Sequence, residues 1–311
     1  MNNILNWGKW LVLLFFCSFS GCNEPAAPIV SILAEFESAK TVGEINNPEI
    51  DEASGLIASR NFAGKLWVHN DSGDKNRLFL INANASYQGS IYLNGVTNRD
   101  WEDIAISRFP DNENYLFVAD IGDNEASYNN EYYIYKFKEP KSQPVANNDQ
   151  YINDIQTIKF KYSDGSRDAE TLLIDHDTKD LYIVTKRENR IRLYRLAAPQ
   201  ATNTTNTAEF VTELPIGGQL NGVPTGATAG DISPDNTEII IKSYFQIFYW
   251  KLQKGENILK ALSRKYDKLL PYSPEPQGEG ICLDNQNLGY FTIGESGESK
   301  NIVNLYYYKR K

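Results

Sequence analysis

The chain has 311 residues, with 31 Lys and Arg against 40 Asp and Glu, and its formal net charge is −9 at pH 7. An acidic chain without a basic stripe argues against nucleic acid as a partner. The 19 tyrosines and 14 phenylalanines, together with many β-branched residues, favour β-structure.

The chain begins with a segment typical of a targeting signal. Lys9 supplies a positive flank, residues 10–19 form an apolar run, and Ser20, Gly21 and Cys22 form a small-residue cleavage site. The apolar run is too short to span a bilayer, which takes roughly 20 apolar residues. The cleavage site resembles the lipobox of bacterial lipoproteins.

That resemblance implies removal of residues 1–21 and a lipid on Cys22, which anchors the protein to a bacterial membrane of the cell envelope, periplasmic or surface-exposed. Residues 22–28 then form a short tether. Residues 29–311 form one domain, because roughly 290 residues of repeats suit a single continuous core. We expect a monomer whose membrane contact is made through the lipid only.

Five short blocks, each with an acidic residue near an apolar run, recur along the chain. They read EASGLIAS at 52–59, DWEDIAIS at 100–107, DAETLLID at 168–175, TAGDISPD at 228–235 and QGEGICLD at 277–284. A β-rich stretch follows each block, so the repeating unit is a small sheet. Aligned on the apolar part, one column holds Glu102, Glu170, Asp231 and Glu279, and the column two residues earlier holds Glu52, Asp100 and Asp168.

In chain order, turn-forming clusters of Gly, Asn, Asp and Ser separate further predicted strands within each unit. These strands are 65–70, 77–81 and 87–93 in the first unit, 115–120, 131–137 and 155–162 in the second, 180–186, 190–196 and 208–214 in the third, 238–243, 246–251 and 262–269 in the fourth, and 289–292 and 304–309 in the fifth. The fifth unit therefore lacks a fourth strand. Residues 29–36 form an apolar strand with no unit of its own.

This pattern predicts an all-β fold, a five-bladed β-propeller closed by an N-terminal strand. The outer strand of a propeller's last blade is commonly supplied by the opposite terminus, which removes exposed sheet edges. We expect residues 29–36 to be that strand. A six-bladed alternative would need a hidden unit in residues 199–225, which carry little strand signal.

In a propeller blade, the start of the first strand and the end of the second lie on the same face. One face therefore gathers the acids that we predict to bind a metal, which are Glu52, Asp100, Glu102, Asp168, Glu170, Asp231 and Glu279. Two bare carboxylates about 4 Å apart repel by roughly 4 kcal/mol at an effective dielectric near 20, so they need a cation, protons or wide spacing. Oxygen ligands favour calcium over zinc. The alternative is that these acids cap strands and solvate the channel mouth.

Basic side chains share that face and are predicted to hold an anionic ligand. They are Arg99, Lys186, Arg187 and Lys242. The alternative is that they pair with the surrounding acids. Glu170 and Glu102 are the candidate catalytic carboxylates. His69 is a candidate general base, although a histidine at a strand end also suits a structural hydrogen bond.

The motifs HNDSGD, DWEDIA, DIGDN, DAE and QGEGI resemble those of a group of secreted bacterial propellers described as phytase-like or esterase-like. More distantly, they are similar to calcium-dependent propellers of the gluconolactonase and calcium-activated nucleotidase types. The resemblance spans residues 45–308. It implies that acids at the channel mouth hold calcium, which here implicates Glu52, Glu102, Glu170, Asp231 and Glu279.

Two functions remain open from the sequence. The first is calcium-dependent hydrolysis of a small phosphate- or ester-bearing substrate at the acidic face. The second is a non-catalytic module that binds a glycan or a protein and uses calcium structurally. The sequence contains no G-x-S-x-G motif, so a serine nucleophile is not indicated.

Overall fold

The computed structural model describes residues 33–217, 219–220, 223–297 and 302–311. The predicted signal segment, the lipidated Cys22, the tether and residues 29–32 lie outside the described residues. Within the described ranges, no helix has the length and apolar composition needed to cross a bilayer.

The main described strands follow one another as five antiparallel sets of four, of which the second and third are joined into one eight-stranded sheet through a parallel pairing of their outer strands. The first strands of the sets are β2 (Ala53–Ala58), β6 (Trp101–Arg108), β11 (Ala169–Ile174), β17 (Ala229–Ile232) and β21 (Gly280–Leu283). The second strands are β3 (Lys65–Asn70), β7 (Asn114–Asp120), β12 (Leu181–Thr185), β18 (Glu238–Lys242) and β22 (Gly289–Ile293). The third strands are β4 (Arg77–Asn82), β8 (Tyr132–Lys138), β13 (Arg192–Leu196), β19 (Ile247–Lys251) and β23 (Asn304–Lys309). The outer strands are β5 (Tyr87–Leu93), β10 (Ile155–Tyr162), β14 (Asn206–Glu213), β20 (Lys268–Leu270) and β1 (Lys40–Glu44).

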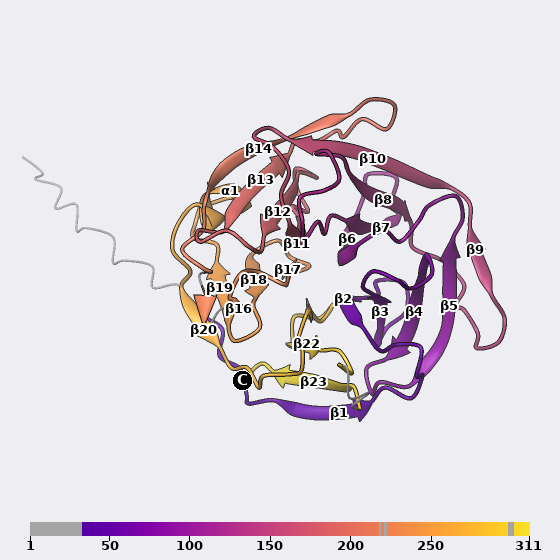
Figure 1. Ribbon diagram of the computed structural model, residues 1–311. Helices are drawn as coiled ribbons and strands as arrows, with labels where there is room; N and C mark the ends of the chain where they lie inside the picture. The colour runs from indigo at the N-terminus through magenta and orange to yellow at the C-terminus, as the bar shows by residue number, and fades with distance from the viewer. Residues whose placement is uncertain (1–32, 218, 221–222, 298–301) are drawn as a thin grey trace, which may run out of the picture. The chain divides into compact units, whose positions relative to one another are not determined.

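The sets are arranged as the blades of a propeller. Each first strand contacts the first strands of the sets before and after it, and β21 contacts β2, so the inner strands form a closed ring. Figure 1 shows these strands around the centre and the outer strands at the rim. The prediction of an all-β propeller is confirmed, and the number of blades stays a prediction. Of the described residues in 199–225, those that form strands belong to β14 or to the short pair β15 (Gln219–Leu220) and β16 (Val223–Pro224), not to a further four-stranded sheet.

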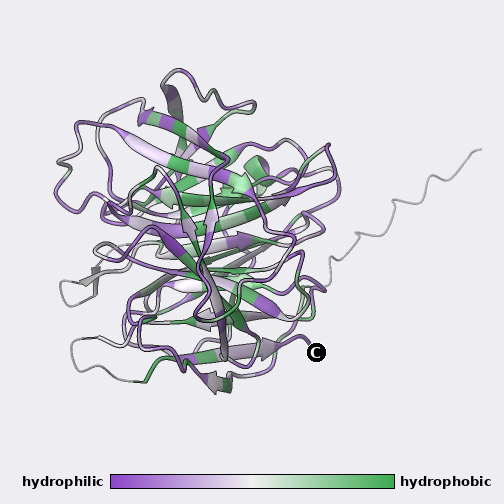
Figure 2. Cartoon of the chain, turned by 90° about the vertical axis from the view of Figure 1, so that its right-hand side faces the viewer, coloured by the Kyte–Doolittle hydropathy of each residue, from purple (hydrophilic) through white to green (hydrophobic). Residues whose placement is uncertain are grey.

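The core lies within and between the sets. The first strands β2, β6 and β11 are buried over nearly their whole length, because each sheet is covered on both faces by its neighbours. Figure 2 shows hydrophobic residues concentrated in the strands and hydrophilic ones in the loops. Outside the sets, β9 (Gln150–Ile152) pairs parallel to β5, and one short helix, α1 (Ile258–Leu262), precedes β20.

The N-terminal part of the described chain closes the last set, but the described residues 33–36 of the predicted strand contribute only an isolated bridge, between Phe36 and Arg310. The closing strand is β1, which pairs antiparallel with β23 and places Lys40 opposite Tyr307. An outer strand faces solvent, so polar residues suit it, and an apolar segment does not. Phe36 instead lies buried in the core, with its ring 5.0 Å from that of Tyr290.

Candidate functional site

Three of the first strands carry an extra residue at the same place. The register shifts where β2 meets β3, where β6 meets β7 and where β11 meets β12, which leaves Ser54, Glu102 and Glu170 outside the regular ladder. A β-bulge re-aims a side chain and is common beside functional sites. The local strand geometry therefore turns Glu102 and Glu170 toward the same end of the ring.

The fourth set has no such shift, and this changes the place of Asp231. Gly230 lies opposite Ile241 and Asp231 lies opposite Ile240 in an unbroken ladder. Gly230, not Asp231, therefore stands in the column of Glu102. A shift of one residue sends a strand side chain to the opposite face.

Asp231 is instead the counterpart of Asp103, and both carboxylates serve the backbone. The Oδ1 atom of each accepts the N–H of the next residue at 2.8 Å. The Oδ2 atom of each accepts an N–H from the first strand of the following set, at 2.9 Å, from Leu172 and Leu283 respectively. The prediction that Asp231 shares the metal-binding face is wrong, because its carboxylate ties two inner strands together.

One polar cavity of about 260 Å³ gathers residues from all five sets, and we call it the acidic cavity. It is lined by Glu52, Asp71, Ser72, Glu102, Asn124, Glu170, Lys186, Arg187, Tyr244, Gln277, Glu279 and Glu295. Six of these side chains are carboxylates and two are basic. The structure thus brings together four of the seven acids proposed from the sequence, and Asp100 and Asp168 lie beside them.

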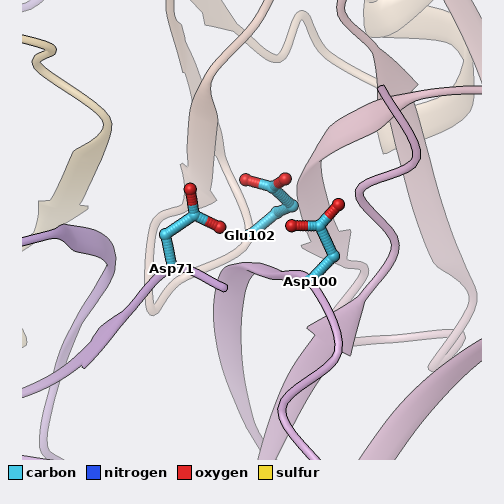
Figure 3. A group of neighbouring side chains, drawn as sticks. All are labelled: Asp71, Asp100 and Glu102. Carbon is cyan, nitrogen blue, oxygen red and sulfur yellow. The ribbon is translucent and has the colours of Figure 1, made fainter. Parts of the chain in front are cut away.

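The carboxylates of this region form three overlapping groups whose ligand atoms lie within 4.8 Å of one another. The groups are Asp71, Asp100 and Glu102; Asp71, Glu279 and Glu295; and Glu102, Asp168 and Glu170. Figure 3 shows the first group, in which Asp71 faces Asp100 and Glu102 from a different backbone segment. Asp71 and Glu102 each belong to two groups, so the carboxylates form a continuous cluster that could hold a metal ion.

Burial makes the ionised state of this cluster costly. Glu102 is 3 % exposed and Glu170 is 2 % exposed. Burial raises the pKa of both well above the usual range, and neighbouring carboxylates add to the effect. Burial likewise raises the pKa of Asp100 to about 6 and that of Asp71 to about 7, and burial with the charge of Glu279 raises the pKa of Glu295 to about 9.

Two carboxylate oxygens of the cluster lack a protein partner. Within the described residues, Oε2 of Glu170 and Oε2 of Glu279 are buried and make no hydrogen bond. Buried polar atoms are nearly always paired, so each unpaired oxygen indicates a missing proton, water or cation. One oxygen of each of these two glutamates therefore stays open to a proton, a water or a cation.

Lys186 and Arg187 line the acidic cavity, but both contact acids. The Lys186 ammonium forms an ion pair with Oε1 of Glu170 and lies 3.5 Å from Oε1 of Glu279. Burial opposes the charge of Lys186, yet the two glutamates raise its pKa, so the ammonium persists. Arg187 forms an ion pair with Asp168. These contacts agree with the alternative interpretation, in which the two cations pair with the surrounding acids.

Arg99 and Lys242, the other two predicted ligand-binding cations, do not line the acidic cavity. The Arg99 guanidinium stacks over Tyr128, 3.7 Å from the ring centroid, and lies 3.5 Å from Asp120. Lys242 is fully buried, donates to the backbone oxygen of Gly278, and burial lowers its pKa to about 8. Both side chains are engaged in packing within the protein.

His69 also lies away from the cavity lining. Its ring is fully buried, sits edge-on to Trp101 with centroids 5.7 Å apart, and contacts the backbone oxygen of Asn70 through Nδ1 at 2.9 Å. Burial lowers its pKa to about 4. This placement suits the structural alternative and does not bring His69 to the acids as a general base.

Asp71, Glu295 and Tyr244 are lining residues that the sequence-based site did not include. Asp71 and Glu295 follow second strands, as Lys186 does. The N–H of Asp71 donates to the backbone oxygen of Glu52 at 2.8 Å, and the N–H of Lys186 donates to that of Asp168 at 3.1 Å, so the two positions correspond. A search for charged residues within two positions after each second strand would have found Asp71 and Glu295.

No family model matches the sequence, and no curated protein matches it. Among solved structures, the chain is similar to the PQQ-bound aldose sugar dehydrogenase of Streptomyces coelicolor, at 10 % identity over 90 % of this chain and 99 % of that one, with a TM-score of 0.48. It is also similar to a luciferin-regenerating enzyme, at 9 % identity over 88 % and 95 % of the two chains, with a TM-score of 0.45. The WD40 repeats of RRP9 match at 13 % identity over 83 % and 67 %, with a TM-score of 0.40.

Proposed function

We propose that this protein is a calcium-binding propeller that hydrolyses a small phosphate- or ester-bearing substrate at the acidic cavity. The observation that carries the proposal is the pair of buried, unpartnered carboxylate oxygens of Glu170 and Glu279 beside a polar cavity. A buried carboxylate is stable only when it is protonated, hydrogen-bonded or paired with a cation. Each of these two oxygens belongs to a residue of a candidate ligand group, Glu170 with Glu102 and Asp168, and Glu279 with Asp71 and Glu295, and a cation bound in either group would supply the missing partner.

Calcium fits the donor set better than zinc or a soft metal. The described lining offers carboxylates and amide and hydroxyl oxygens, and it contains no histidine or cysteine. Calcium takes six to eight such oxygens, whereas zinc favours nitrogen and sulfur. The residues that would hold it are those of the three carboxylate groups described above, in which Asp71 and Glu102 each take part twice. When bound, the ion supplies a Lewis acid for an oxyanion or for an attacking water.

The remaining residues of the acidic cavity position the substrate and move protons. The Tyr244 hydroxyl donates to Oε1 of Glu279 at 2.6 Å and fixes that carboxylate. The guanidinium of Arg187, 40 % exposed, is available at the rim for a further oxygen of the substrate. Burial raises the pKa of Glu170 and that of Glu102 well above the usual range, so these two proposed catalytic carboxyl groups hold a proton more readily than exposed ones do.

The second candidate is a non-catalytic module that binds a glycan or a protein, with calcium as a structural ion. It is favoured by the contacts of the two basic lining residues, since Lys186 pairs with Glu170 and Arg187 with Asp168. The variant Glu170→Gln separates the two functions. A catalytic glutamate loses turnover and keeps its fold, whereas a ligand of a structural ion loses stability.

The first experiment is thermal unfolding of the purified protein in EDTA and in millimolar calcium. Calcium at 100 times its dissociation constant should add about 2.7 kcal/mol to the free energy of unfolding. A clear shift justifies a screen of phosphomonoesters, esters and lactones in calcium. A shift without turnover on any of them favours the binding module, and no shift in a well-folded protein contradicts the calcium site.

We further propose that the protein is a monomeric lipoprotein of the cell envelope, anchored through Cys22. The motif around Cys22 supports this, as described above. Cells grown with labelled fatty acid should incorporate the label into the wild-type protein and not into Cys22→Ser. Equal labelling of the two proteins contradicts the anchor.

A further inference from the structure

A second cavity adjoins the acidic cavity, and we call it the aromatic cavity. Its volume is about 360 Å³, and it is lined by Lys186, Arg187, Tyr244, Phe245, Pro274, Glu275 and Gln277. Lys186, Arg187, Tyr244 and Gln277 also line the acidic cavity. The two cavities therefore share a wall.

Rings, rather than free charges, distinguish the aromatic cavity. Tyr244 and Phe245 lie edge to face, with ring centroids 6.4 Å apart and planes at 73°. The side chain of Glu275, the carboxylate of the lining, is 2 % exposed and accepts hydrogen bonds from Thr292 at 2.6 Å and from Tyr272 at 3.1 Å. These hydrogen bonds stabilise the carboxylate of Glu275 within the protein, so the aromatic cavity suits an uncharged, apolar group.

The turn that carries the two rings is held by its own hydrogen bonds. The N–H of Ser243 donates to the backbone oxygen of Gln246 at 2.8 Å, and Oγ of Ser243 accepts the N–H of Phe245 at 3.3 Å. Phe245 nevertheless stays 41 % exposed. A fixed, half-exposed ring can bind an apolar group without first losing backbone freedom.

Tyr244 links the two cavities chemically. Its hydroxyl donates to Glu279 in the acidic cavity, and its ring borders the aromatic cavity. A ligand with a charged end in the first cavity would extend past this ring into the second. Small-molecule sites usually measure about 300–1,000 Å³. The acidic cavity alone, at about 260 Å³, falls below that range, and the two cavities joined lie within it.

We infer that the aromatic cavity is the subsite for an apolar, ring-sized group joined to the anionic or ester centre of the substrate. This rests on the proposed function, which places that centre in the acidic cavity. The substrate class is therefore an aryl phosphate or aryl ester rather than a simple alkyl one. Phe245 is the residue that sets this preference, because its ring is free for contact.

The test compares phenyl phosphate, methyl phosphate and inorganic phosphate by calorimetric titration of the calcium-loaded full-length protein. In parallel, the rate of hydrolysis of phenyl acetate is compared with that of methyl acetate. We expect the phenyl compound to be favoured about tenfold or more over the methyl compound. Phe245→Ala should remove that preference and leave the affinity for inorganic phosphate unchanged, whereas Phe245→Tyr should keep it.

Phe210→Ala is the matched control, since Phe210 on β14 is 45 % exposed and does not line either cavity. It should leave the preference intact. Equal affinity and turnover for phenyl and methyl probes overturns the subsite and leaves the proposed function standing. A preference that survives in Phe245→Ala also overturns it. If the protein binds calcium and neither binds nor turns over any probe, the proposed function fails and the subsite fails with it.

Discussion

Gly122 lies directly against the carboxylate of Glu102. A Cβ atom on Gly122 would sit 2.1 Å from Oε1 of Glu102 and 2.6 Å from Cγ of Asp100. The N–H of Gly122 also donates to the backbone oxygen of Asp100 at 3.2 Å. Because glycine has no side chain, the carboxylates of Glu102 and Asp100 can occupy the space next to residue 122.

Gly122→Ala should therefore weaken calcium binding without unfolding the protein. The methyl group must displace Glu102 or Asp100, which form one candidate ligand group with Asp71. We expect the dissociation constant for calcium to rise roughly tenfold or more, or about 1.4 kcal/mol. Calorimetric titration with calcium measures this, and circular dichroism checks the fold. An unchanged dissociation constant would exclude Glu102 and Asp100 as ligands.

Glu102→Gln should raise stability in EDTA and reduce the stabilisation by calcium. The change removes one charge from a group of crowded carboxylates, so the metal-free protein gains on the order of 1 kcal/mol. It also removes a ligand charge. The control is Glu139→Gln, a buried glutamate outside the cavity that accepts from Ser59 and Trp67. That variant should lose stability and keep the full calcium increment.

Asp231→Asn should lower stability equally in calcium and in EDTA. The amide cannot accept at both positions where the carboxylate accepts the N–H groups of Ile232 and Leu283. Leaving a buried N–H unpaired costs about 1–3 kcal/mol. Thermal unfolding with and without calcium distinguishes the roles, because a loss of the calcium increment would return Asp231 to the metal site.

Lys186→Met should destabilise the metal-free protein and enlarge the stabilisation by calcium. Breaking a buried ion pair costs about 3–5 kcal/mol, because the charge of Glu170 is left uncompensated. Calcium would then neutralise both Glu170 and Glu279, which Lys186 contacts in the native chain. Unfolding curves at several calcium concentrations measure both effects. This prediction assumes that the Lys186 ammonium and calcium compete for Glu170 and Glu279. If calcium stabilises Lys186→Met less than it stabilises the wild type, that assumption is wrong.

Stability in EDTA should fall as the pH rises from about 4 to about 9. Burial raises the pKa of Asp100 to about 6, that of Asp71 to about 7 and that of Glu295 to about 9. Unfolded carboxyl groups ionise near pH 4. The folded state therefore holds more protons than the unfolded state across this window, and the free energy of unfolding decreases with pH.

Saturating calcium should flatten this pH dependence, because the cation replaces the protons that the carboxylates otherwise need. Melting temperatures from pH 5 to pH 9, with EDTA and with calcium, provide the comparison. A melting temperature in EDTA that stays level or increases toward pH 9 would show that these carboxyl groups ionise without cost in the folded state.

The repeat of acid and apolar run predicted much of the fold. Apolar runs divided by turn residues are local features of the chain, so they were enough to predict the strands of the sets. The repeat of the acids was enough to predict that Glu52, Glu102, Glu170 and Glu279 cluster. The closing strand was misplaced, because apolarity was used to find it. An outer strand such as β1 is polar and half-exposed.

The composition of the site depended on the register between the first and second strands of each set, which the apolar pattern alone does not give. Bulges at Glu102 and Glu170, and their absence at Gly230, decide which side chains reach the acidic cavity. The fourth set lacks the extra residue, so the carboxylate of Asp231 accepts a backbone N–H from the neighbouring first strand.

The sequence by itself determined a ring of small sheets with acids at one end, because strand period and turn residues act over a few neighbours. Only the tertiary structure decided which acids meet and which cations are already paired. It also placed the buried ring of His69 edge-on to Trp101 and away from the lining of the acidic cavity. The physical reason is that pairing and burial depend on distances in space, which join residues far apart in the chain, as with Lys186 and Glu279 at a separation of 93.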